Sequence, residues 1–244
     1  MLKRVVPFLL VLALFSGCKT GALGEAGADL FTAVTISNDE LIQVSQEMRA
    51  QGDAEAKVAP RGNQYAQRLE RLTKKHVNED GLALNFKVYI TPDINANATA
   101  DGSIRFYSGI MDMMTDGELL FILGHEIGHV KDGDSLDKIR TAYTASAARK
   151  GASAAGGVAG ALSDSMLGDL LQTVLNAQFS QSQESDADAY GYEFMTRHGY
   201  DTKAAVSALK KLDSLGSSGG IMASHPNSGA RAAAIQARID AGKK

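Results

Sequence analysis

The chain has 244 residues, a length that suits one domain of ordinary size with enough chain to build a core. Its formal net charge is -3, and its basic residues are scattered rather than clustered, which gives no reason to expect a nucleic-acid partner. Tryptophan is absent, and alanine and glycine are abundant, a composition that favours closely packed helices.

The first segment, residues 1–17, has the pattern of a signal peptide. Lys3 and Arg4 precede an apolar run of about eleven residues, which is too short for a settled membrane span. The run ends in Phe15-Ser16-Gly17-Cys18, which resembles the bacterial lipobox, in which cleavage leaves the cysteine as a lipidated first residue. The alternative is a plain secretory signal followed by an accidental cysteine.

Lipidation of Cys18 would attach several acyl chains, and more than one chain is needed for stable anchoring. Residues 18–36 then form a lipidated N-terminus and a small, polar tether. Lys19 is not aspartate, which in a Gram-negative cell favours the outer membrane, with the chain on its periplasmic face. Cys18 is the single cysteine, so no disulfide is available to stabilise the fold.

Apolar residues at helical spacing predict helices over residues 38–50 and 62–76. Alternating residues between Asn85 and Pro92 predict a strand over 86–90, and a second strand follows at 104–107. The segment between the strands, rich in Asn, Asp and Ala, is predicted to be a loop. The chain therefore reads as an α+β fold, mainly α, with a small β-sheet.

The next helix contains the motif H-E-x-x-H. Thr115 and Glu118 match the capping box T-x-x-E at its start. Gly124 and Gly128 lie inside this helix and cost helix propensity of roughly 1 kcal/mol each. We expect close approach of another backbone to offset that cost.

Further helices are predicted over residues 135–150, over 162–198 as one or two helices closed by Gly199, and over 202–215 and 229–241. The Ala/Gly-rich run at 151–161 is either a tight helix contact or a mobile segment over the active site. Residues 216–220 form a predicted flexible loop. His76 and His198 fall at helix ends, where imidazoles commonly cap backbone carbonyls, and no function is assigned to them.

The motif predicts a metal site. His125 and His129 are four residues apart, so both imidazoles lie on one face of a helix and can bind one metal ion. Glu126 between them can take a proton from a metal-bound water. A catalytic zinc needs a third protein ligand, and Glu184 with Asp188 at i+4 offers one. Glu184 would bind the metal, while Asp188 would accept a hydrogen bond from a ligand imidazole such as His125. The alternative for this pair is an acidic, solvated helix face.

With these motifs, the chain resembles the gluzincin zinc peptidases of the CAAX-prenyl-protease and HtpX type, including bacterial lipoprotein proteases. The resemblance covers nearly the whole mature chain. It rests on the H-E-x-x-H motif, the E-x-x-x-D pair, the Asn95-Ala96 segment leading to residues 104–109, and His225-Pro226 followed by Arg231. It implies a gluzincin-like peptidase domain over 37–244, one Zn²⁺ per chain, and Glu126 as the general base.

The resemblance also gives expectations for two further parts of the site. A substrate strand would pair with an exposed edge formed by residues of the two segments: Asn95, Ala96, Ile104, Arg105, Phe106 and Tyr107. His225 has three interpretations: it stabilises the oxyanion together with Arg231, it occupies the open zinc position and holds the enzyme latent, or it is an ordinary loop histidine.

The sequence therefore predicts a lipid-anchored zinc endopeptidase that faces the periplasm and degrades misfolded or misassembled envelope proteins. Two alternatives stand beside it. One is a latent peptidase that acts mainly as a chaperone or assembly factor for outer-membrane proteins. The other is a structural lipoprotein with a fortuitous motif.

Overall fold

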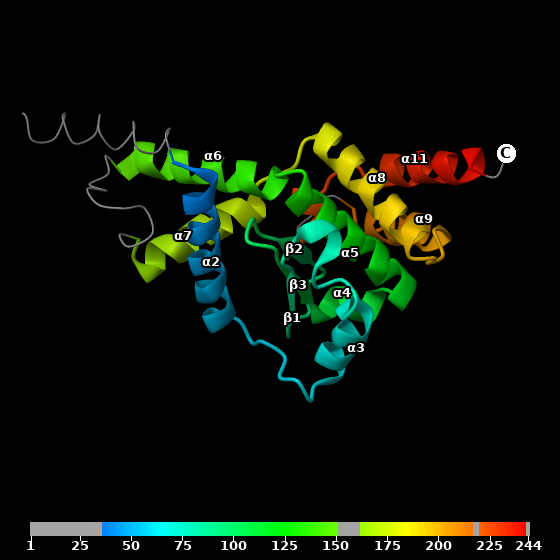
Figure 1. Cartoon of the computed structure of the whole chain (residues 1–244), viewed down its shortest axis with the longest axis horizontal. Coiled ribbons are helices and arrows are strands. Elements are labelled where there is room, and N and C mark those ends of the chain that lie inside the picture. Colours follow the sequence, from blue (N-terminus) through cyan, green and yellow to red (C-terminus); the bar gives the residue numbers. More distant parts are fainter. Residues whose placement is uncertain (1–35, 151–161, 217–219, 243–244) are drawn as a thin grey trace, which may run out of the picture.

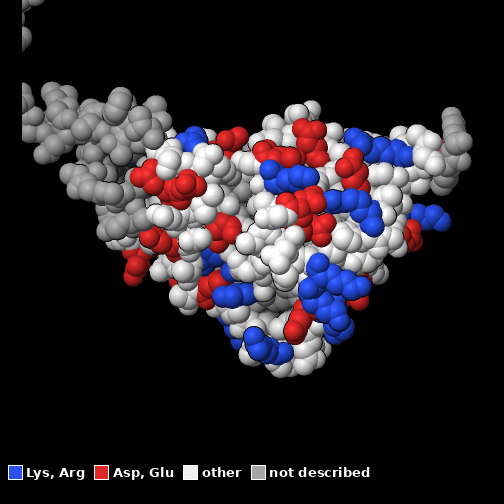
Figure 2. All heavy atoms as spheres, in the orientation of Figure 1, with Lys and Arg blue, Asp and Glu red and all other residues white. Residues whose placement is uncertain are grey.

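The computed structural model describes residues 36–150, 162–216 and 220–242. The predicted signal peptide, Cys18, the tether up to residue 35 and the run at 151–161 lie outside the described residues. Among the described helices, none is both long and apolar enough to cross a membrane. Acidic and basic side chains are interspersed over the face seen in Figure 2.

The described part of the chain is mainly helical, as predicted, with a small sheet at its centre (Figure 1). The first half contains α2 (Asn38–Glu55), α3 (Gln64–Thr73), the 3₁₀ turn η1 (Glu79–Gly81), α4 (Ser108–Met113) and α5 (Asp116–Lys131). The second half contains α6 (Asp134–Lys150), α7 (Asp164–Asn176), α8 (Gln181–Arg197), α9 (Lys203–Asp213), α10 (Ile221–Ser224) and α11 (Ser228–Ala241).

The sheet has three strands in the order β1-β3-β2. β1 (Asn85–Tyr89) pairs in parallel with β3 (Ser103–Tyr107), and β2 (Ala96–Ala98) pairs antiparallel with β3. The segment between the two predicted strands thus contains a third strand. Its three residues are too few, and too poor in β-branched side chains, to be recognised from an alternating pattern.

Helix α5 begins as the sequence predicts. Thr115 accepts from the backbone amide of Glu118, and the Glu118 carboxylate accepts from the amide of Thr115. The ring of Phe121 and the side chains of Leu119 and Leu123 lie in the main hydrophobic core together with β3 and α9. A cap at one end and a buried apolar face therefore fix the position of the helix that carries H-E-x-x-H.

Helix α8 crosses α5 with the two backbones in close contact. A Cβ on Gly124 would lie 3.1 Å from the Cα of Gly191, and one on Gly128 would lie 3.0 Å from the Cα of Ala187. The expected close approach is thus present, and its partner is the helix that carries Glu184. Glycine in α5 brings Glu184 within reach of the two histidines.

A second hydrophobic cluster is formed by α2, α6 and α7, which pack together at one end of the molecule (Figure 1). The range 162–198, predicted to hold one or two helices, contains two, α7 and α8, joined by residues 177–180. Ser180 caps α8, since its hydroxyl accepts from the amide of Gln183. The short helix α10 follows the predicted loop over 216–220 and ends immediately before His225.

Candidate metal centre

The two motif histidines and Glu184 converge at the crossing of α5 and α8. His129 Nε2 lies 3.1 Å from His125 Nε2 and 3.3 Å from Glu184 Oε1. All three side chains are buried, with exposed fractions of 2% or less. The structure thus brings together the three residues expected to hold the metal.

His225 joins this cluster from the segment after α10. Its Nδ1 lies 2.8 Å from Glu184 Oε1 and 3.1 Å from His125 Nε2. One ligand atom from each of His125, His129, Glu184 and His225 lies within 4.8 Å of the others. Of the three interpretations of His225, this arrangement matches the one in which the imidazole occupies the fourth ligand position.

Carboxylates hold the far nitrogens of the two motif imidazoles. His125 Nδ1 lies 3.0 Å from Asp188 Oδ1, and His129 Nδ1 lies 2.8 Å from Asp134 Oδ2. A proton on each Nδ1 leaves the Nε2 lone pairs directed at one another, which is the tautomer a metal requires. Asp188 is where the sequence predicts it.

Asp134 was not recognised from the sequence. It stands in Asp132-Gly133-Asp134, which reads as a helix-ending turn, and it begins α6 rather than a loop. Its other oxygen accepts from Gln183 Nε2 at 2.9 Å, which connects the start of α6 to α8. Its position five residues after His129 is the only local signal, and that spacing alone does not distinguish it from Asp132.

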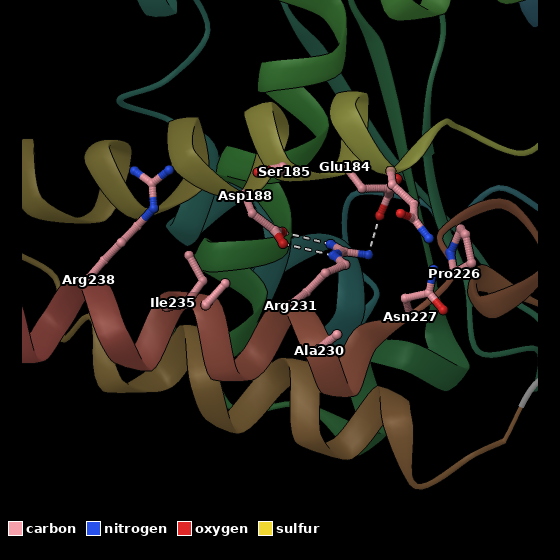
Figure 3. A pocket seen from close by; sticks show the side chains of 11 residues that line it. Glu184, Ser185, Asp188, Pro226, Asn227, Ala230, Arg231, Ile235 and Arg238 are labelled. Carbon is pink, nitrogen blue, oxygen red and sulfur yellow. Dashed lines mark hydrogen bonds and ion pairs between the residues drawn. The ribbon is translucent and has the colours of Figure 1, made fainter.

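Arg231 on α11 is bound to the carboxylates of the site. Its Nε and Nη2 donate to the two oxygens of Asp188 at 2.7 and 2.6 Å, and Nη1 forms an ion pair with Glu184. The expectation that Arg231 stabilises an oxyanion is therefore not met, because its guanidinium is directed at two buried carboxylates. Arg231 instead positions Asp188 and Glu184 (Figure 3).

The charges of the site suit a divalent cation. Burial opposes ionisation of Glu184, but the neighbouring His225 and His129 hold its pKa well below the usual value. Burial lowers the pKa of His225 to about 4, and burial also lowers the pKa of His125, so both imidazoles are neutral. Burial opposes protonation of His129, but Asp134 and Glu184 raise its pKa, so a metal would have to displace a proton from this imidazole. Neutral imidazoles and an ionised carboxylate are the forms that bind zinc.

Glu126 is buried beside the cluster. Its Oε1 has no hydrogen-bond partner among the described residues and lies 3.6 Å from His225 Nε2. Burial raises the pKa of this carboxyl group. A buried carboxylate oxygen without a donor is costly unless another group occupies the space in front of it. The donor set and this oxygen together fit a metal ion with a water molecule beside it.

The sheet edge next to the site differs from the expectation. β3 is paired on both sides, by β1 and by β2, so Ile104, Arg105, Phe106 and Tyr107 cannot pair with a substrate. The edge strand is β2, which begins at Ala96, directly after Asn95. The expectation was wrong for β3 because the missed strand β2 covers it.

Backbone groups of β2 alternate between β3 and the outer edge of the sheet. Tyr107 donates to the carbonyl of Asn95, and Thr99 donates to the carbonyl of Ser103. Because bonded and non-bonded pairs alternate along antiparallel strands, the backbone groups of Ala96 and Ala98 point away from β3. The Ala98 carbonyl lies 3.5 Å from the hydroxyl of Ser135, at the start of α6.

Phe179, in the link between α7 and α8, forms a wall of the site. Its ring stacks on His129 with centroids 3.6 Å apart, and the ammonium of Lys138 lies 3.1 Å from the Phe179 ring centroid. Since His129 occupies one face of the ring, Lys138 lies on the other. Neither residue was predicted, because both are brought to the site by packing between α6 and the α7–α8 link.

On its other side the site borders a cavity of about 370 Å³ between α8 and α11. Figure 3 shows Glu184, Asp188 and Arg231 at its inner wall, with Ile235 and Arg238 along α11. The cavity thus reaches the carboxylates that hold the site together, and it does not contain the motif histidines.

Two helices that each supply metal-binding side chains, with a carboxylate between the two histidines, define a metallopeptidase site. Residues 63–239 match the profile of Peptidase family M48. The chain belongs to this family and is a metalloprotease, as the sequence motifs predict.

Two relatives that match over nearly their full length, and a third that matches over part of its length, agree with this assignment. The chain is 38% identical to "Metalloprotease YcaL" of Escherichia coli (strain K12), over 95% of this chain and 94% of that protein. It is 35% identical to "Metalloprotease LoiP" of the same organism, over 98% of both. It is also 24% identical to the E. coli "Beta-barrel assembly-enhancing protease", over 86% of this chain and 46% of that protein.

Proposed function

We propose that this metalloprotease is a zinc endopeptidase that is anchored by lipid on Cys18 to the periplasmic face of the outer membrane. Its proposed substrates are misfolded or misassembled envelope proteins. One relative bears the name of a β-barrel assembly-enhancing protease, which supports an envelope substrate. The observation that carries the catalytic proposal is the buried, unpartnered Oε1 of Glu126 beside four converging ligand atoms.

In this proposal His125, His129 and Glu184 hold one zinc ion. Bound zinc supplies a Lewis acid that lowers the pKa of a coordinated water to around neutrality. Glu126 accepts the proton from that water and later delivers it to the leaving amine. Burial, which raises the pKa of Glu126, makes its carboxylate a stronger base for the first of these transfers.

Asp188, Asp134 and Arg231 are positioning residues in this reaction. Each acts through a ligand: Asp188 through His125, Asp134 through His129, and Arg231 through Glu184 and Asp188. An extended substrate would pair with the outer edge of β2 at Ala96, which is buried in this structure, since the Ala98 carbonyl already accepts from the Ser135 hydroxyl. Only backbone recognition follows from this edge.

The substrate test compares wild-type protein lacking residues 1–18 with Glu126→Gln, using unfolded casein. Glutamine keeps the shape of the side chain but cannot take a proton, so cleavage should be abolished while about one catalytic zinc is retained. Full activity in Glu126→Gln would show that this mechanism is wrong. Metal content is measured on the same samples, and loss of zinc together with activity would count against a role for Glu126 as a base alone.

The second candidate is a latent peptidase that acts mainly as an assembly factor for outer-membrane proteins. The observation favouring latency is the position of His225, whose Nδ1 contacts Glu184 and His125 where a water would bind. In that state His225 competes with the reacting water. Movement of the segment after α10 would then be required before hydrolysis.

A His225→Ala variant separates the two roles of this residue. If His225 is a fourth ligand, its removal opens the metal and casein cleavage should rise several-fold. If it stabilises the oxyanion, cleavage should instead fall by about 100-fold. Initial rates at equal zinc content decide between them, and an unchanged rate would remove His225 from the site.

A further inference from the structure

A second group of metal-ligating side chains lies away from the catalytic centre. His76 follows α3, Glu79 begins the turn η1, and His198 caps the C-terminal end of α8. Glu184 lies in the first turn of α8 and His198 just beyond its last, which separates the two groups by about 21 Å along the helix. The two histidines were expected to cap backbone carbonyls, but their rings contact Glu79 instead.

The three side chains converge on one point. His76 Nδ1 lies 2.8 Å from Glu79 Oε2, and His198 Nε2 lies 2.9 Å from Glu79 Oε1. Ligand atoms of the three residues all lie within 4.8 Å of one another. Two imidazoles and one carboxylate form the same donor set as His125, His129 and Glu184, and it is a set that zinc prefers.

His76 is held as a metal ligand would be. The side chain is fully buried, its ring packs against Phe194 at a centroid distance of 4.7 Å, and its Nε2 lies 2.9 Å from the hydroxyl of Tyr200. That hydroxyl can donate to Nε2 or accept from Nε2–H. When it accepts, the lone pair of Nδ1 is free for a metal, so the partner needed to orient the ring is already present.

Access and charge also suit a cation. The His198 side chain is 32% exposed, so an ion and a water ligand can reach the cluster from solvent. The C-terminal end of α8 contributes partial negative charge. Arg197 Nη2 lies 3.4 Å from Glu79, and its Nη1 is paired at 2.8 Å with Asp80. Lys131 also contacts the Asp80 carboxylate at 2.9 Å, so Asp80 offsets only part of the nearby positive charge.

We propose that His76, Glu79 and His198 form a second zinc site, which binds one ion with water completing its coordination. This ion ties the segment after α3 to the end of α8, two parts of the chain more than one hundred residues apart. The competing state is a hydrogen-bonded network in which Glu79 accepts from both imidazoles and no ion binds. The proposal is independent of whether the catalytic centre cleaves peptides.

Zinc stoichiometry tests the proposal directly. Three proteins lacking residues 1–18 are equilibrated with zinc and desalted. The first carries Glu126→Gln, so that it cannot digest itself. The other two carry this change together with either His198→Ala or Glu184→Gln. We expect two zinc ions per chain in the first and one in each of the others. Equal zinc content with and without His198→Ala would overturn the second site, whereas retention of both ions in Glu184→Gln would count against the catalytic site.

A thermal measurement covers the case in which a variant binds zinc weakly. In chelator-treated protein carrying Glu126→Gln and Glu184→Gln, added zinc should raise Tm by several degrees, since an ion that binds only the folded state stabilises it. Adding Glu79→Gln or His198→Ala should remove this rise. If zinc leaves Tm unchanged in the first protein, or raises it equally in all three, the second site is absent.

Discussion

Two aspartates determine how the motif histidines present their Nε2 atoms. Asp188 contacts His125 Nδ1 from α8, and Asp134 contacts His129 Nδ1 from the start of α6. Burial opposes ionisation of Asp188, but Arg231 and His125 hold its pKa below the usual value. The two imidazoles are therefore oriented by carboxylates that come from different helices, and each carboxylate can be removed by a separate substitution.

Asp134→Asn should lower the zinc affinity of the catalytic centre by about 10- to 100-fold, because loss of a carboxylate behind a ligand imidazole weakens its basicity and orientation. Competition with a zinc chelator measures this affinity. The control is Asp137→Asn, on the exposed side of the same helix. An Asp134→Asn affinity equal to that of the control would exclude a role for Asp134 in holding the metal.

At the scale of elements, the crossing of α5 and α8 builds the site. The glycines of α5 lower its helix propensity, yet they allow the Cα atoms of α8 to approach so closely that a Cβ would meet them. Glu184 reaches His129 Nε2 only because the two backbones lie this close. Helix packing and metal binding thus depend on the same residues.

Gly128→Val should lower the free energy of unfolding by about 2 kcal/mol, because its branched side chain meets the Ala187 backbone and forces α8 outward. Zinc affinity should fall with it, since Glu184 moves with α8. Urea denaturation and zinc competition measure the two effects. The matched control is Gly62→Val, at a position where a Cβ would meet nothing within 4 Å, and similar losses in both variants would contradict this account.

At the scale of the whole molecule, two hydrophobic clusters share the described part of the chain. The larger one surrounds the sheet, α5, α9 and α11, and the smaller one joins α2, α6 and α7. Helix α6 starts at Asp134 beside the metal centre and also packs in the smaller cluster through Ile139. The proposed tether leads into α2, so the smaller cluster contains the first described helix after the anchor together with two helices that follow the H-E-x-x-H helix in the chain.

The anchor is tested with the full-length chain expressed in a Gram-negative host. Wild-type protein should incorporate labelled fatty acid and sediment with membranes, because two or more acyl chains give stable anchoring. Cys18→Ser should lose the label and no longer be held on the membrane by lipid. Absence of label in the wild type would favour the plain secretory signal.

The local order of residues was enough to predict the candidate ligands of the metal centre. Helical periodicity places His125 near His129 and Glu184 near Asp188, and a capping box marks the start of α5, all within a few residues of chain. The family resemblance followed from the same motifs, and the mainly helical fold with a small sheet is as predicted. These features depend on residues that are close together along the chain, so they can be predicted from the sequence without the structure.

Tertiary structure alone decided the rest. The strand β2 makes β3 central, Arg231 binds Asp188 and Glu184, and His225 meets His125 from one hundred positions away. Asp134 and Lys138 become part of the site only when α6 packs beside it. Such contacts depend on how helices cross and strands pair, and periodicity within one segment carries no information about either. Sequence therefore identified the metal-binding motif, and packing decided which other side chains lie around it.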